Sequence, residues 1–244
     1  MTMSSFPGGT SVTRLSVYQD PCADGLAGGT PHLHTASTEA YVVVGGHGAL
    51  QTLDPSGFRE TALTAGSTVW FTPGTIHRAI NHDDLQVLVI MQNAGLPEAG
   101  DAVMTFPPEL VADRDRYLAA ATLPAEQTAA AVHRRRDLAV DGFHLLTASA
   151  RRGDLQPLLA FYASAVALVR PAVAGWRAIW EQSVASQARQ TAAVLDAMER
   201  GDAGHLADAA LLESPQSLDT RWGMCGRLRT HDVAHPIRYA PPQP

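Results

Sequence analysis

The chain changes its pattern of hydrophobic residues once, near the Pro107-Pro108 pair, and this change limits the folds open to it. Before residue 95, short β-branched runs such as residues 40–44 and 86–90 are separated by turn-forming segments rich in Gly, Asp and Pro. After the prolines, apolar residues recur at helical spacing. The sequence therefore predicts an α+β protein, with an N-terminal antiparallel β-barrel or jelly roll over residues 1–103 and a mainly α-helical region over 104–244.

Several segments of the second half carry the helical pattern. Residues 109–121 and 155–169 each predict one helix, a longer helix is expected between Pro171 and Gly201, and a short one over 205–212. The basic run at residues 134–136, three consecutive arginines, is interpreted as a solvated helix face. The remaining tail is expected to be loop-like, with a flexible end from Tyr239 to Pro244.

Charge and cysteine content exclude several classes of protein. The net charge of −6 at pH 7 argues against a protein that binds the nucleic-acid backbone. Cys22 and Cys225 lie far apart and neither belongs to a CxxC motif, so we expect two free thiols in a reducing cytoplasm. The N-terminus carries no signal-peptide pattern, and the apolar run at residues 158–169 is too short to span a membrane.

Three histidines and one glutamate form the strongest functional pattern. His32 and His34 are two positions apart, so along a strand both side chains project from one face. Glu39 follows at an odd spacing and reaches that face only if residues 35–38 bend, while His77 follows a Pro-Gly turn and must be brought in by the fold. Imidazole and carboxylate ligands together suit one divalent transition metal, such as Fe, Mn, Zn or Ni.

These residues resemble the two sequence motifs of the cupin family. The first motif, HxH, four residues, Glu, six residues and Gly, is matched by His32, His34, Glu39 and Gly46. The second is matched by Gly66, Pro73, His77 and Asn81. Two turn positions depart from the pattern, because Leu26 stands where the family has glycine and Pro73-Gly74 replaces Pro-x-Gly. The resemblance covers about residues 15–95 and implies a small β-barrel whose metal ligands are His32, His34, Glu39 and His77.

Three further residues lie close to these motifs. Tyr41, two positions after Glu39, could face the cavity as an acid, base or hydrogen-bond donor, or be an aromatic residue of the barrel wall. Asn81 is expected to orient a turn through side-chain hydrogen bonds. Arg78 is expected at the surface, because it neighbours His77 and should point the other way.

The resemblance implies a fold more strongly than an activity, because this barrel serves many functions. We expect a metal-dependent, dioxygenase-like enzyme that acts on a small oxygen-bearing molecule, with Glu39 and Tyr41 as candidate catalytic residues. A non-redox isomerase or epimerase is one alternative, and a non-catalytic metabolite-binding or regulatory protein is the other. The apolar stripes of the helices predict a homodimer, with neither nucleic acid nor a membrane as partner.

Overall fold

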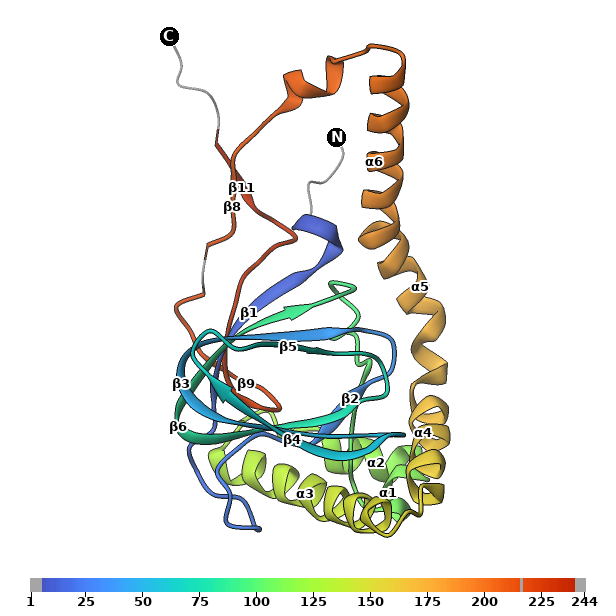
Figure 1. Cartoon of the computed structure of the whole chain (residues 1–244). Coiled ribbons are helices and arrows are strands. Elements are labelled where there is room, and N and C mark those ends of the chain that lie inside the picture. The colour runs from blue at the N-terminus through green and yellow to red at the C-terminus, as the bar shows by residue number, and fades with distance from the viewer. Residues whose placement is uncertain (1–5, 216, 240–244) are drawn as a thin grey trace.

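The computed structural model describes residues 6–215 and 217–239; the start of the N-terminus and residues 240–244, part of the expected flexible end, lie outside this range. The N-terminal half is built from strands, as expected, and helices follow them (Figure 1). The first seven strands are β1 (Ser11–Val17), β2 (His32–His34), β3 (Glu39–Asp54), β4 (Gly57–Thr64), β5 (Thr68–Phe71), β6 (Ile76–Met91) and β7 (Ala102–Met104). The class predicted from the sequence, α+β, is therefore confirmed.

The strands form one rolled antiparallel sheet that does not close on itself. Its main order is β4-β3-β6-β1-β10-β9, while β5 pairs with β3, and β2 pairs with both β6 and β7. The predicted antiparallel arrangement is therefore confirmed, but the sheet is not closed into a barrel. The edge strand β4 is contacted by helix α3 instead of by another strand, which is a common way to protect an open edge.

The two longest strands bend where they pass each other. β3 and β6 pair along most of their length, with register shifts between Val43 and Gly48. At Gly46, φ is +66°, and a Cβ atom would lie 2.1 Å from the Asp84 carbonyl oxygen. Glycine is therefore required at this position of the first cupin-like motif by both backbone conformation and close approach.

The helices are more broken than the sequence predicts. They are α1 (Pro108–Val111), α2 (Arg114–Ala121), α3 (Ala129–Arg151), α4 (Gln156–Val169), α5 (Val173–Gln182) and α6 (Val184–Glu199). The expected helix over 109–121 is divided, because the Asp113 side chain accepts hydrogen bonds from the amides of Asp115 and Arg116 and caps α2. The long helix expected after Pro171 is divided at Ser183, whose backbone is non-helical. The short helix expected over 205–212 is a 3-10 turn at Gly204–Asp208.

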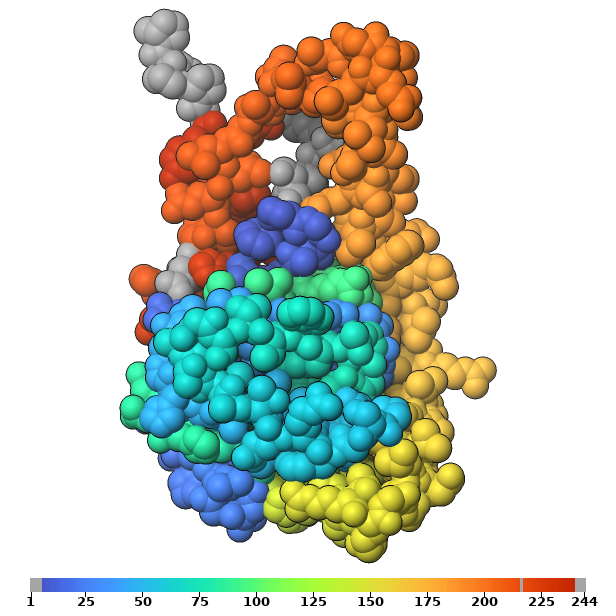
Figure 2. Space-filling view, viewed as in Figure 1, coloured from blue at the N-terminus to red at the C-terminus, as the bar shows by residue number. Residues whose placement is uncertain are grey.

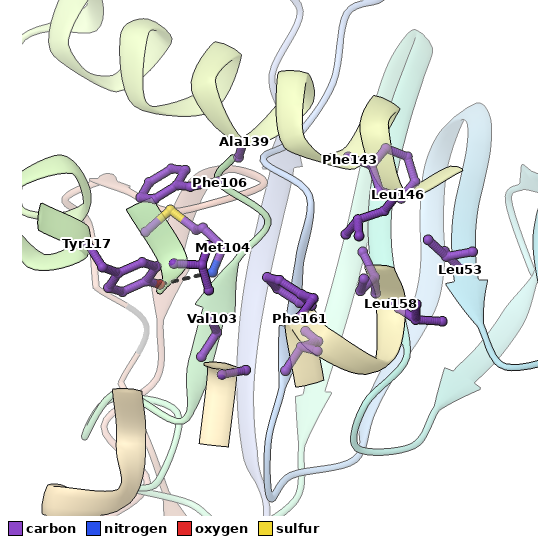
Figure 3. Packing of buried hydrophobic residues seen from close by; sticks show 14 residues of the cluster. Leu53, Val103, Met104, Phe106, Tyr117, Ala139, Phe143, Leu146, Leu158 and Phe161 are labelled. Carbon is purple, nitrogen blue, oxygen red and sulfur yellow. Dashed lines mark hydrogen bonds between the residues drawn. The ribbon is translucent and has the colours of Figure 1, made fainter. Parts of the chain in front are cut away.

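Helix α3, for which the sequence analysis expected a helix face at residues 134–136 but gave no bounds, packs on one side of the sheet. Its apolar residues Phe143 and Leu146 pack with Leu53 of β3, with α4 residues Leu158 and Phe161, and with the rest of one buried cluster (Figure 3). The backbones also approach closely, since a Cβ atom at Gly142 would lie 1.9 Å from the Thr105 carbonyl oxygen. The helical half therefore packs directly on the strand half.

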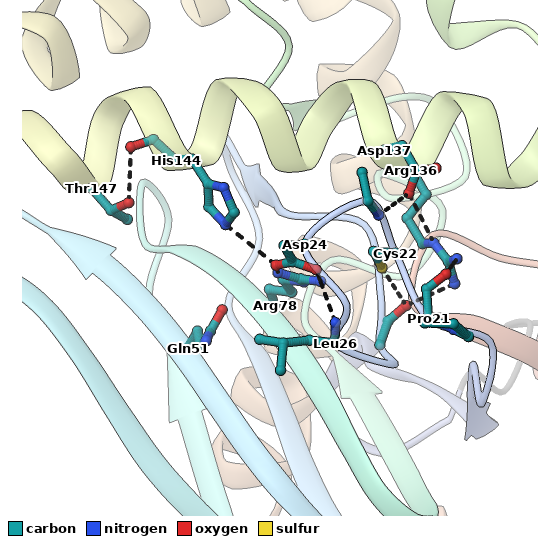
Figure 4. Close-up of polar contacts among 12 residues, drawn as sticks. Pro21, Cys22, Asp24, Leu26, Gln51, Arg78, Arg136, Asp137, His144 and Thr147 are labelled. Carbon is teal, nitrogen blue, oxygen red and sulfur yellow. Dashed lines mark hydrogen bonds and ion pairs between the residues drawn. The ribbon is translucent and has the colours of Figure 1, made fainter.

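Two arginines expected at the surface, Arg78 of β6 and Arg136 of α3, are buried between α3 and the sheet (Figure 4). Arg136 is fully buried and donates hydrogen bonds to the carbonyl oxygens of Asp20, Pro21 and Gly28. Arg78 is also fully buried, and its guanidinium group donates to both carboxylate oxygens of Asp24, at 2.6 and 3.1 Å.

The prediction of solvated positions was wrong here because the loop over residues 18–30 passes between α3 and the sheet. That loop brings carbonyl and carboxylate oxygens into the interior, where each needs a donor.

The tail was expected to be loop-like, but part of it returns to the sheet. β8 (Leu212–Glu213) and β11 (Ile237–Arg238) form a small separate pair, and β9 (Arg221–Trp222) and β10 (Gly226–Thr230) lie between them in the sequence. β10 pairs antiparallel with β1, matching Thr230 to Thr13 and Leu228 to Leu15. A strand near the end of the chain thus lies beside one near its beginning.

Helix α6 stands away from the sheet and leads into this returning segment (Figures 1 and 2). Through a short 3-10 turn, α4, α5 and α6 form a helical stretch, Gln156–Glu199, that is long and apolar enough to cross a membrane by length and composition alone. This stretch is longer than the apolar run seen in the sequence. Core helices pass the same test, and α4 buries Leu158, Phe161 and Ala165, but 22% of the most apolar window of the stretch is buried.

Candidate metal centre

The first two histidines of the site share a short strand. His32 and His34 occupy the ends of β2 and are both buried. β2 lies between β6 and β7, with His32 paired to His77 on one side and to Met104 on the other. The two imidazole rings lie on the same side, with centroids 5.2 Å apart, as the even spacing predicted.

The remaining two residues begin the long strands. Glu39 opens β3 after the bend at residues 35–38, and His77 lies at the start of β6. The prediction that a bend restores Glu39 to the face of the histidines is confirmed. One ligand atom from each of the four buried residues lies within 4.8 Å of every other, and these residues are His32, His34, Glu39 and His77. The structure thus brings together all four predicted ligands.

Each imidazole is held through its Nδ1 atom. His32 Nδ1 lies 2.9 Å from the Thr30 carbonyl oxygen, and His77 Nδ1 lies 3.1 Å from that of Thr75. An acceptor at Nδ1 places a proton there and leaves Nε2 for the centre of the cluster. The backbone just before each strand therefore orients two of the three rings.

The third ring is oriented by Asp101, a residue that the sequence analysis missed. His34 Nδ1 lies 2.6 Å from Asp101 Oδ1, and the aspartate is fully buried. The Asp101 carbonyl oxygen also accepts hydrogen bonds from the Thr35 amide and hydroxyl, which fixes the bend after β2. Asp101 lies in the connector before β7, where no motif or spacing distinguishes it from an ordinary loop residue.

The donor set fits a cation. Glu39 Oε2 lies 3.1 Å from Nε2 of both His34 and His77. Glu39 Oε2 and His77 Nε2 are nevertheless buried without a hydrogen-bond partner. Buried polar atoms normally have partners, and a divalent metal between these atoms would satisfy both of them at once.

The charges of the cluster follow from burial and close contacts. Burial alone would lower the pKa of His34, but its contacts with Asp101 and Glu39 outweigh this and raise it to about 10. Burial alone would raise the pKa of Glu39, but His77 and His34 hold it well below its usual range. Burial and the neighbouring imidazoles His77 and His34 lower the pKa of His32. The cluster without metal therefore holds an ionised glutamate, a charged His34 and a neutral His32.

We expect metal binding to release a proton from His34, because a coordinating imidazole must be neutral. His34 is protonated at pH 7, so metal affinity should rise with pH until the His34 pKa of about 10 is reached. Titration calorimetry of metal-free protein in buffers of different ionisation enthalpy measures the released protons. Asp101→Asn removes a contact that raises this pKa and should reduce the release. A binding heat that does not depend on the buffer would contradict this expectation.

A cavity of about 540 Å³ opens beside the cluster. Strand register explains its walls, because inward-facing residues of neighbouring strands lie in rows. Tyr41 of β3, Val89 of β6, Thr13 of β1 and Thr230 of β10 form one such row. Glu39 begins the next row, beside Met91 and Ser11. The row that carries Tyr41 therefore ends on β10, which the sequence analysis did not place in the sheet.

Tyr41 lines this cavity and is itself fully buried. Its hydroxyl group donates a hydrogen bond to Cys225 Sγ at 3.7 Å. Burial raises the pKa of Tyr41 well above its usual value, with further contributions from Cys225 and Glu39. The hydroxyl group is therefore protonated at neutral pH.

The returning tail supplies a whole wall of the cavity. Six lining residues come from it, namely Trp222, Gly223, Met224, Cys225, Leu228 and Thr230. Tyr18 holds the segment in place, donating from its hydroxyl group to the Gly223 carbonyl oxygen and from its amide to that of Cys225. Both cysteines are free, as expected, and both are buried.

Comparison with known proteins identifies the strand region. Residues 23–91 match the Cupin domain family. No curated protein sequence matches the chain.

Solved structures resemble only about a third of the chain. A Klebsiella pneumoniae protein with a double-stranded β-helix domain is 18% identical, with a TM-score of 0.26, and the match covers 34% of this chain and 64% of that one. The nucleoside dehydratase Pac13 is 18% identical, with a TM-score of 0.28 and coverages of 36% and 63%. A TDP-fucose-3,4-ketoisomerase from Campylobacter jejuni is 11% identical, with a TM-score of 0.29 and coverages of 33% and 58%. The chain thus spans less than two-thirds of each of these proteins.

Proposed function

The chain belongs to the cupin superfamily through residues 23–91, and from this premise we propose that it is a metal-dependent enzyme acting on a small oxygen-bearing molecule. The observation that carries the proposal is the buried cluster of three imidazoles and one carboxylate, which adjoins an open cavity. Structural sites normally surround their metal completely, whereas a catalytic site keeps positions open. The cavity would provide the space for a ligand at those positions.

His32, His34, Glu39 and His77 would hold one divalent transition metal, with Fe, Mn, Zn and Ni all compatible with this donor set. Such a metal supplies Lewis acidity toward a bound oxygen atom and, where it is redox-active, the ability to react with dioxygen. Asp101 keeps His34 in the tautomer that directs Nε2 to the centre. Glu39 contributes the negative charge that lowers the net charge of the loaded site.

Two residues would handle protons or orient the substrate. Tyr41 faces the cavity with a protonated hydroxyl group, so we assign it the role of hydrogen-bond or proton donor to substrate oxygen. Glu39 also lines the cavity, and a shift of its carboxylate away from the metal would let it accept a proton. The apolar walls around both groups, such as Val89 and Met91, limit the access of water.

Within this proposal, oxidative cleavage is the favoured reaction and a non-redox isomerisation or epimerisation the alternative. The experiment uses protein purified without a metal-chelating tag, elemental analysis, and a panel of diketones, catechols and thiols assayed for product and for oxygen consumption. Turnover with oxygen consumption supports a dioxygenase, and turnover without it supports an isomerase. Tight binding of a panel member without any product would support a non-catalytic binding protein. Protein without stoichiometric metal would refute the proposal.

We also propose that the chain works as a cytoplasmic homodimer, with residues 1–103 as the cupin unit and 104–244 as an extension. Four large apolar side chains on α5 and α6 are exposed, namely Val173, Trp180, Leu195 and Met198. Free thiols at Cys22 and Cys225 suit a reducing compartment.

Light scattering is expected to give twice the chain mass of 25.9 kDa, and Leu195→Glu should weaken the association. Leu118→Glu is the matched control, because Leu118 is exposed on α2, away from α5 and α6. A mass that stays at that of one chain at every concentration would contradict the dimer.

A further inference from the structure

Three consecutive arginines of helix α3 lie in three different environments. Arg134 is exposed, and Arg136 is fully buried among three carbonyl acceptors. Arg135 is half-buried and lines the cavity beside the metal cluster, where it supplies the guanidinium group among the lining residues. Arg135 lies on α3, outside residues 23–91, so the part of the chain that matches the family does not include this guanidinium group.

The guanidinium group of Arg135 makes fewer hydrogen bonds than those of Arg78 and Arg136. Its one hydrogen bond runs from Nη1 to the Ala121 carbonyl oxygen, at 3.1 Å, and its buried Nε atom has no partner, as is also true of the other two arginines. Across residues 6–215 and 217–239, no carboxylate forms an ion pair with it, whereas Arg78 pairs with Asp24. Burial lowers the pKa of Arg135, because its charge is only partly solvated. A buried charge is normally paired, so this group is suited to an anion from outside the chain.

The rest of the cavity restricts what that anion can be. Most of its wall is apolar, formed by Leu15, Val89, Met91, Trp222, Met224 and Leu228. Two acidic residues line the cavity: Glu39 belongs to the metal cluster, and Glu98 lies at the exposed edge, where its carboxylate accepts a hydrogen bond from the Gly95 amide at 3.0 Å. The volume of about 540 Å³ is in the range of pockets for small organic ligands.

We propose that Arg135 binds the carboxylate group of the organic molecule taken up by this cavity, and is a specificity-determining residue. A single guanidinium group matches a carboxylate in charge and in its two-pronged geometry, whereas a phosphate dianion would call for more donors than this wall provides. The inference rests on the proposed function for the metal-bound end of the molecule. It narrows the substrate to an apolar monocarboxylate that carries an oxygen group for the metal.

The test compares two probes of the same shape on the whole protein, with and without metal. Phenylacetate carries the carboxylate, and phenylacetamide replaces it with a neutral amide; phenyl phosphate is the third arm. We expect calorimetry to show phenylacetate binding at least about 10-fold more tightly than phenylacetamide, as for a charge-assisted contact. Arg135→Gln should abolish this preference, and Arg134→Gln, on the exposed neighbour, should retain it. Arg135→Lys keeps the positive charge but lacks the two-pronged guanidinium group, so it should retain part of the preference for phenylacetate. This variant replaces Arg135→Gln if Arg135→Gln does not fold.

The possible results distinguish failure of the Arg135 inference from failure of the proposed function. Equal affinities for the two probes in the natural protein, no binding of either probe, or a preference that survives Arg135→Gln would overturn the inference. Tighter binding of phenyl phosphate than of phenylacetate would overturn the carboxylate assignment. Because the comparison is also made without metal, a carboxylate preference in protein that binds no metal would leave the Arg135 inference standing while the proposed function fails. Stoichiometric metal without a carboxylate preference would overturn the Arg135 inference and leave the proposed function standing.

Discussion

The His77→Ala variant is expected to lose stoichiometric metal, with an affinity lowered by more than about 100-fold. Removal of a residue that only orients a ligand costs 10–100-fold, and the loss of a ligand should exceed this. His77 is fully buried, and its Nε2 atom lies 3.1 Å from Glu39 Oε2, so alanine leaves a gap in the donor set. Competition with a chromophoric chelator, together with elemental analysis, measures the change.

A graded series of variants separates loss of a ligand from loss of the fold. Asp101→Asn keeps the shape of the side chain that orients His34 and should cost an intermediate 10–100-fold. Glu39→Gln preserves size while removing the charge, and it should rank with His77→Ala. His47→Ala, at an exposed position outside the cluster, should bind metal as the natural protein does. If all these folded variants held metal equally, the metal would have to lie elsewhere.

The Asp24→Ala variant is expected to lose about 3–5 kcal/mol of stability, because the buried Arg78 guanidinium would be left without its counter-charge. For a chain of this size that loss lowers Tm by roughly 10 °C. The pair also joins the loop over residues 18–30 to β6, so its loss should loosen that loop. Thermal unfolding followed by circular dichroism measures the effect.

The controls for this variant test the physical cause. In the double variant Asp24→Ala, Arg78→Met, the unpaired charge is also removed, and much of the stability should return. His144→Ala removes the outer contact to Asp24, of 3.3 Å, from a half-exposed ring and should cost less than about 1 kcal/mol. Equal destabilisation by the single and the double variant would show that packing, and not the buried charge, is responsible.

Much of the candidate site could be predicted because its signals are local. The parity of a strand places His32 and His34 on one face and requires a bend before Glu39. In the structure His32 and His34 share strand β2, and a bend at residues 35–38 precedes Glu39 at the start of β3, as these local rules require. The role of Asn81 follows the same logic, since its side chain bonds the Leu85 amide and the Val17 carbonyl oxygen, as predicted.

The features that were missed depend on contacts between distant parts of the chain. β10 pairs with β1, which lies more than 200 positions earlier in the chain, and the short sequence of β10 does not indicate which strand is its partner. Arginine is usually exposed, so the sequence alone predicts surface positions for Arg78 and Arg136. They are buried because the loop over residues 18–30 packs against them and accepts their hydrogen bonds. Asp101 acquires its role through a single contact with His34. Long-range pairing and buried polar networks are set by the whole fold.

The pairing of β10 with β1 also has a consequence for how the protein is made. At a synthesis rate of 5–20 residues per second, roughly 10–40 s separate the appearance of β1 from that of its partner. During this interval the free edge of β1 and the apolar interior around Leu15 face the solvent or a chaperone. The strand region can therefore bring His32, His34, Glu39 and His77 together long before the neighbouring cavity has a complete wall. Under the proposed function, metal acquisition would then precede substrate selectivity within the lifetime of a single growing chain.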